Sequence, residues 1–158
     1  MNNSKIKVPF LSLKLEDKKK KLEYLNQLSK LLDTGMFISK SKKSSINIFE
    51  EKLKKYFKKK YCILTSSGSS SLFLALKALN LNEGDEVITS PYSWLTTASA
   101  IVSAGLKPVF VDIREDYNIF PLEIEKKITK KTKVILPIHM CGQMCDMIWI
   151  KKIAQKHK

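Results

Sequence analysis

Apolar residues in the first 57 positions recur with the period of an α-helix. Six leucines fall near one face at helical spacing, and Gly35 follows them as a helix terminator. They are Leu15, Leu22, Leu25, Leu28, Leu31 and Leu32. A second helix is predicted to begin at Asn47, an N-cap residue with Glu50 three positions on. Its apolar side consists of Phe49, Leu53, Tyr56 and Phe57. We therefore expect two amphipathic helices, joined by the polar run 39–45.

From residue 61 the pattern changes to short apolar runs that alternate with helical segments. The runs with the length and composition of strands are residues 61–65, 86–89, 108–112 and 133–138. Helical patterns cover residues 70–79, 94–104, 121–128 and the segment after Asp146. Strands that alternate with helices are typical of a parallel sheet covered on both faces, so the sequence predicts the α/β class.

Composition excludes several classes of protein. The 158 residues are 44% hydrophobic and 28% charged, with five glycines and five prolines, which is typical of one globular core rather than a disordered or collagen-like chain. The longest uncharged stretch, 87–106, contains seven Ser or Thr residues, so we expect no membrane insertion. The three cysteines and the lack of a secretory leader pattern predict a cytoplasmic protein without disulfides.

The net charge of +14 raises the question of a nucleic-acid partner. Of the 29 basic residues only Arg114 is an arginine, whereas bidentate recognition of phosphates and guanines favours arginine over lysine. The lysine clusters 18–21 and 58–60 lie on polar faces of predicted helices or just beyond them, where lysines are ordinarily solvated. We therefore expect no nucleic-acid partner.

A turn of small residues, 65–71, joins the first predicted strand to an apolar helix. Backbone N–H groups at a helix N-terminus are unsatisfied and attract anions, and Gly68 lets a ligand approach closely. Ser69 and Ser70 add hydroxyl donors suited to a phosphate. The turn lacks the lysine of a nucleotide triphosphatase loop. The alternative is that these serines only cap the helix.

Trp94 is a second candidate, because it also lies between a predicted strand and a predicted helix. Its large rigid face suits stacking on a heteroaromatic ring. The alternative is a tryptophan packed in the core.

His139, Cys141 and Cys145 are residue types that bind zinc, and they fall within seven positions. Structural zinc sites usually combine two close-spaced pairs of ligands, and elsewhere only Cys62 and His157 remain. We therefore expect no metal site. The two cysteines are interpreted as small, partly buried hydrophobic residues, and His139 as a hydrogen-bonded residue at a strand end.

Six segments share their order and spacing with one family of enzymes. They are VPFLSL (8–13), TGMFIS (34–39), TSSGSSSL (65–72), GDEVIT (84–89), PVFVD (108–112) and ILPIHMCGQ (135–143), the last followed by Asp146 and Met147. Together they resemble the N-terminal part of the DegT/DnrJ/EryC1/StrS family of sugar aminotransferases, which are pyridoxal-phosphate enzymes of fold type I.

The resemblance implies an α/β fold that is a partial three-layer αβα large domain, truncated before the strands that carry the family's Asp and Lys. It implies an N-terminal segment and helix at 1–46 and an incomplete domain for pyridoxal 5'-phosphate at 47–158. In the family's fold the first strand, here 61–65, lies across the sheet from the next three and is joined to them through later strands.

The resemblance also implies roles for single residues. Gly68, Ser69 and Ser70 would hold the cofactor phosphate, and Trp94 would stack on the pyridine ring. The family's Asp, which keeps the ring nitrogen protonated, and its Lys, which binds the cofactor covalently, come later, and no lysine here matches that position. We therefore expect no catalytic residue in this chain and no transamination by the chain alone.

By the same resemblance, the whole enzyme would aminate a nucleotide-linked keto sugar with glutamate as donor, and a homodimer would complete its pocket. The products of such enzymes serve surface polysaccharides. The sugar, the carbon, and the choice between amination and dehydration stay open. A different hypothesis is a standalone, non-enzymatic domain that binds a phosphorylated ligand or an anionic polymer.

Overall fold

The computed structural model describes residues 12–35, 37 and 44–157. The chain comprises two compact units, Met1–Leu64 and Thr65–Lys158. The domain boundary expected between residues 46 and 47 stays a prediction. The segments 8–13, 34–39 and 39–45 lie partly or mostly outside the described residues.

Helix α1 of the first unit spans Lys18–Thr34 and confirms the first predicted helix. Asp17 caps its start, because the side chain accepts a hydrogen bond from the backbone N of Lys20 at 3.0 Å. Gly35 ends the helix at a φ of 62°, a left-handed conformation that glycine adopts without steric cost. No residue of α1 is buried, so its leucine face is largely exposed within the described part of the unit.

Helix α2 spans Ser45–Phe57 and confirms the second predicted helix, but it begins earlier than expected. The hydroxyl oxygen of Ser44 accepts a hydrogen bond from the backbone N of Asn47 at 3.2 Å. The predicted N-cap at Asn47 is therefore wrong. Ser44 supplies the capping oxygen three residues upstream, and Asn47 lies in the first turn.

Residues 61–65 do not form the strand that the sequence predicts. Among the described residues the first strand begins at Glu86. Leu64 in this segment is instead held within the first unit, because its backbone N donates to Glu50 Oε1 at 2.8 Å. A strand needs a neighbour that satisfies its backbone ladder, and none of the three strands that form pairs with this segment. The apolar run alone is therefore not enough.

The second unit consists of helices that alternate with three strands. In chain order it contains α3 (Gly68–Ala78), β1 (Glu86–Thr89), α4 (Thr96–Ser103), β2 (Lys107–Phe110), α5 (Pro121–Lys127), β3 (Thr132–Leu136), the short 3-10 helix η1 (Met140–Gly142) and α6 (Met147–His157). All strands are parallel in the order β2-β1-β3. These elements confirm the α/β class, with ends within two residues of those predicted. None of the helices in the described part of the chain has the length and apolar character that a membrane crossing requires.

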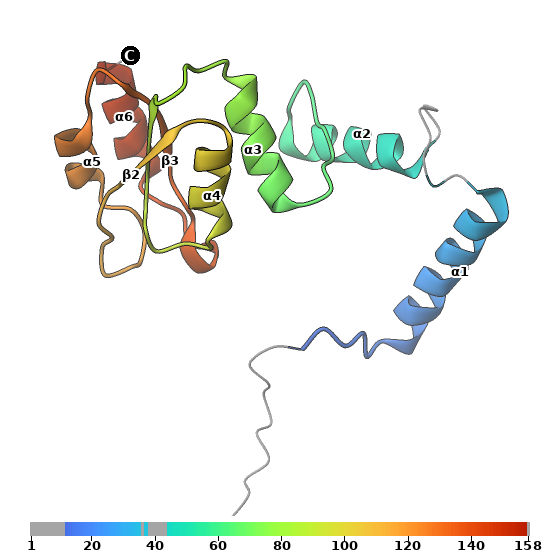
Figure 1. Cartoon of the computed structure of the whole chain (residues 1–158). Helices are drawn as coiled ribbons and strands as arrows, with labels where there is room; N and C mark the ends of the chain where they lie inside the picture. Colours follow the sequence, from blue (N-terminus) through green and yellow to red (C-terminus); the bar gives the residue numbers. More distant parts are fainter. Residues whose placement is uncertain (1–11, 36, 38–43, 158) are drawn as a thin grey trace, which may run out of the picture. The chain divides into compact units, whose positions relative to one another are not determined.

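The sheet separates two hydrophobic clusters. Val87 and Ile88 in β1 are both fully buried, and because successive strand residues point to opposite faces they belong to different clusters. Ile88 packs with Val111, Ile119, Ile124, Cys145, Ile150 and Ile153. Val87 packs with Leu76, Ile101, Ala104 and Leu106. Figure 1 shows the same three layers, with α5 and α6 on one side of the sheet and α3 and α4 on the other.

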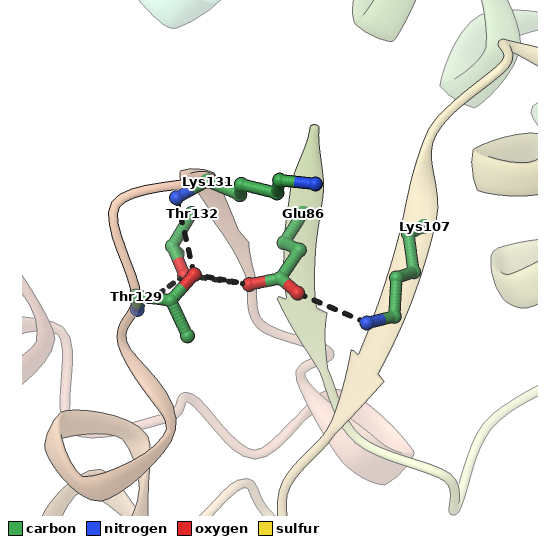
Figure 2. Close-up of polar contacts among 5 residues, drawn as sticks. All are labelled: Glu86, Lys107, Thr129, Lys131 and Thr132. Carbon is green, nitrogen blue, oxygen red and sulfur yellow. Dashed lines mark hydrogen bonds and ion pairs between the residues drawn. The ribbon is translucent and has the colours of Figure 1, made fainter. Parts of the chain in front are cut away.

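Glu86 joins all three strands at the amino edge of the sheet (Figure 2). Glu86 is 6% exposed, and one of its carboxylate oxygens accepts a hydrogen bond from Lys107 Nζ at 3.1 Å. The other accepts from Thr129 Oγ1 at 2.6 Å and from Thr132 Oγ1 at 3.4 Å. The hydroxyl of Thr129, followed by Lys107, holds the pKa of Glu86 below its ordinary value. The carboxylate therefore links the starts of β2 and β3 to β1.

Candidate functional site

The carboxyl edge of the sheet gathers the segments that carry the candidate chemistry. Parallel sheets bind ligands beyond the carboxyl ends of their strands. The ends of β1 and β3 are joined there, because Thr89 Oγ1 donates to the backbone oxygen of Leu136 at 2.8 Å. Trp94 follows β1 by five residues, and His139 follows β3 by three. The loops after these two strands are therefore neighbours.

The turn at residues 65–71, here called the serine turn, partly serves to cap the N-terminus of α3. Ser67 is the N-cap, and its Oγ accepts from the backbone N of Ser70 at 3.1 Å. The Ser70 hydroxyl lies 3.1 Å from that of Ser66 and 3.0 Å from that of Ser67. Thr65 and Ser71 share a further hydroxyl contact of 2.5 Å. These contacts hold the backbone of the turn in place at the start of the helix.

The same turn also leaves donors open. Within the described residues, nothing accepts from the backbone N of Gly68 or of Ser69, and the Ser69 hydroxyl has no partner. A Cβ placed on Gly68 would meet no atom within 4 Å, so there is room in front of the helix. Two backbone N–H groups and one hydroxyl at the positive end of an 11-residue helix form an arrangement that can receive a phosphate.

Trp94 is 79% exposed, which excludes the alternative that it packs in the core of this unit. It borders a cavity of about 290 Å³ whose other lining residues are Ser90, Pro91, Ser93, Leu95, Thr97, Ala98 and Phe110. These residues come from the loop after β1, the start of α4 and the end of β2. The serine turn is not among them, so this cavity does not itself join Trp94 to Ser69 and Ser70.

The His-Cys segment after β3 is used for internal hydrogen bonds. The backbone N of Cys145 donates to His139 Nδ1 at 3.1 Å, and Cys145 Sγ donates to the backbone oxygen of Ile138 at 3.0 Å. Burial raises the pKa of the Cys145 thiol. These contacts confirm a hydrogen-bonded His139 and a buried Cys145. The expectation for Cys141 is wrong, because it is exposed at a φ of 50° in the short turn.

Asn118 is a buried residue that the sequence analysis missed. Its Oδ1 accepts from the backbone N of Met140 at 3.1 Å. Its Nδ2 donates to the backbone oxygens of Gln143 and Met144 at 3.3 and 3.4 Å. One side chain from the loop after β2 thus holds the turn after β3. In the sequence, Asp116 and Asn118 indicate only a turn, and in that turn the backbone N of Asn118 donates to Asp116 Oδ1 at 3.1 Å.

Comparison with known proteins agrees with this architecture. The sequence profile of the DegT/DnrJ/EryC1/StrS aminotransferase family matches residues 18–158. The chain is 40% identical over 154 residues to 3-oxo-glucose-6-phosphate:glutamate aminotransferase of Bacillus subtilis, covering 96% of this chain and 34% of that protein. It is 37% identical over 152 residues to dTDP-3-amino-3,6-dideoxy-alpha-D-galactopyranose transaminase of Aneurinibacillus thermoaerophilus, covering 95% of this chain and 41% of that protein.

A solved structure gives the same result. The crystal structure of NtdA from Bacillus subtilis with bound cofactor PMP superposes with a TM-score of 0.86 at 40% identity, covering 95% of this chain and 34% of that one. The chain therefore belongs to the DegT/DnrJ/EryC1/StrS aminotransferase family. It spans between a third and about two fifths of the length of the curated relatives described above.

Proposed function

We propose that this chain is the N-terminal, cofactor-binding part of a pyridoxal-phosphate-dependent sugar aminotransferase. The proposed substrates of the whole enzyme are a nucleotide-linked keto sugar and glutamate. The names of two relatives, a dTDP-sugar transaminase and a glutamate aminotransferase, support this choice. The homodimer, the link to surface polysaccharide and the cytoplasmic location stay predictions.

The open donors at the start of α3 carry the proposal. The backbone N–H groups of Gly68 and Ser69, with the hydroxyls of Ser69 and Ser70, would bind the cofactor phosphate. The hydroxyl of Ser70 would turn from Ser66 and Ser67 toward the anion, at little cost because hydroxyls rotate freely. The chemistry of the donor set fits a phosphate dianion, since all its members donate and none adds negative charge.

Trp94 would cover one face of the pyridine ring. Its exposed indole offers the flat surface that stacking requires, and the loop after β1 carries it to the ligand-binding edge. Pyridoxal phosphate, when bound, supplies an electron sink for chemistry next to an amine. The residues of this chain bind and orient that group, and none of its lysines matches the family position that would bind it covalently.

Titration of the 158-residue chain with pyridoxal phosphate, followed by absorbance, tests the proposal. The double variant Ser69→Ala, Ser70→Ala removes two charge-assisted hydrogen bonds of roughly 1.5–3 kcal/mol each, so affinity should fall at least about tenfold. Ser29→Ala, which changes an exposed serine of α1, is the matched control and should bind as the unaltered chain does.

Inorganic phosphate, added as a competitor, should displace the cofactor from the unaltered chain. Equal affinity in the double variant and the control would show that the turn is only a helix cap. Failure to bind pyridoxal phosphate, combined with binding of an anionic polymer such as heparin, would favour the standalone domain instead.

A further inference from the structure

We propose that His139 is a further binding residue of this site, which donates a hydrogen bond from Nε2 to the phenolate oxygen of the cofactor ring. This inference rests on the proposed function, because it names another contact of the same cofactor. It concerns a residue for which the sequence analysis expected only a hydrogen bond at a strand end.

The protonation of the ring follows from its neighbour. The backbone N of Cys145, 3.1 Å from His139 Nδ1, carries a hydrogen and is a donor only. Nδ1 must therefore accept, which leaves the proton of the neutral imidazole on Nε2. The contact thus selects one tautomer, and in that tautomer the outer nitrogen is a donor.

The orientation of the ring is fixed from inside the protein. Cys145 is 4% exposed, and its thiol donates to the backbone oxygen of Ile138, the residue before His139. Asn118, which is 2% exposed, holds the backbone at Met140, Gln143 and Met144. The backbone on both sides of the histidine is therefore held by buried polar groups, a support that pre-organises a binding residue.

The outer nitrogen of the ring is available to a ligand. His139 is exposed, and Nε2 has no hydrogen-bond partner among the described residues. It lies three residues beyond Leu136, whose backbone oxygen accepts from the last residue of β1, so it belongs to the same edge as the Trp94 loop. Among the described residues, no group of three His, Cys, Asp or Glu side chains is placed to hold a metal ion.

The cofactor offers few oxygens that such a donor could reach. Its phosphate is assigned to the turn before α3, and its ring is assigned to Trp94. The phenolate oxygen is the anionic acceptor that remains on the ring. A neutral N–H donor stabilises that charge without competing for the phosphate.

Nitrogen NMR of the imidazole rings tests the proposal directly, because the chain contains only two histidines. The variant His157→Gln, altered in α6, leaves the His139 ring alone in the spectrum. In the free chain we expect that ring as the tautomer with hydrogen on Nε2. Pyridoxal phosphate should shift the Nε2 resonance, and inorganic phosphate should leave it in place.

Affinity measurements on two variants give an independent result. His139→Leu should weaken pyridoxal phosphate about tenfold, as expected for a lost hydrogen bond to a charged group, and leave inorganic phosphate unchanged. His139→Gln keeps an acceptor for Cys145 and an outward donor, so its affinity should stay within about twofold of the unaltered chain.

Three outcomes would overturn the inference. Cofactor binding that neither shifts the His139 resonance nor weakens in His139→Leu would remove it and leave the proposed function standing. Equal weakening of cofactor and inorganic phosphate would place His139 at the phosphate instead of the ring. A complete lack of cofactor binding by the unaltered chain would remove both proposals.

Discussion

The two edges of the parallel sheet satisfy their polar groups in opposite ways. At the amino edge, both carboxylate oxygens of Glu86 are occupied by Lys107 and by threonine hydroxyls (Figure 2). The start of α3 lies toward the carboxyl edge, because the other end of this helix packs at Leu76 against Leu106, the residue just before β2. There the N–H groups of Gly68 and Ser69 have no acceptor among the described residues. At one edge of the sheet the polar side chains link the strands to one another. At the other edge, backbone N–H groups remain open to a ligand.

The difference shows how to separate structural from functional polar residues. A group whose partners all come from its own chain contributes to folding, whereas exposed N–H groups at a helix start are free to bind an anion in place of water. Neither edge leaves a buried side-chain nitrogen or oxygen unsatisfied in the described part of the chain. Gly68 and Ser69 are both exposed, so their open N–H groups lie at the surface, where a ligand can reach them.

The largest expected effect is that the chain alone catalyses no transamination. Incubation with pyridoxal phosphate, glutamate and a nucleotide-linked keto sugar should give no transamination, because no lysine occupies the family's covalent position. Borohydride reduction followed by mass spectrometry should find no specific labelled lysine. Reproducible labelling of one lysine together with turnover would contradict this prediction.

A smaller effect is expected from Trp94→Ala. Loss of stacking worth about 0.5–1.5 kcal/mol should lower affinity for pyridoxal phosphate roughly twofold to tenfold. Binding of inorganic phosphate should not change, because the anion contacts come from the turn before α3. Trp149→Ala, in α6, is the matched control and should bind the cofactor normally. Equal loss of phosphate binding in Trp94→Ala would mean that the two contacts are not separate.

The smallest effect is expected at the amino edge, from Glu86→Gln. The lowered pKa of Glu86 means that the folded state favours the carboxylate. Its contribution to stability is complete above the ordinary value of 4.5 and is lost as the pH falls through the lower folded-state pKa. The melting temperature of the variant should therefore lie a few degrees below that of the unaltered chain at pH 7, and the gap should close toward pH 3.

Glu123→Gln provides the control for this experiment. Glu123 pairs with Lys126 one helical turn away on α5, and such solvated pairs contribute little. Its melting temperature should follow that of the unaltered chain at each pH. A pH-independent gap for Glu86→Gln would show that the carboxylate charge does not hold the strands together.

Local pattern was sufficient for the elements of the second unit. The run 86–89 became β1 with the predicted limits, since both faces of this central strand are covered and its middle residues, Val87 and Ile88, are fully buried. The run 61–65 is more apolar but forms no strand, because pairing depends on a neighbour that local sequence does not specify. The role of Asn118 depends on contacts with residues 22 to 27 positions away, and the tautomer of His139 depends on a contact across a turn. Neither kind of contact produces a periodic pattern from which the sequence could predict it.

The outer sides of the two edge strands are unequal as templates for a further strand. Lys107 and Val111 donate their backbone N–H groups inward, to Asp85 and Thr89, so the residue between them at 108 faces outward. That residue is Pro108, which has no N–H to offer an incoming chain. β3 contains no proline and keeps its donors. A further strand would therefore find one backbone donor fewer beside β2 than beside β3.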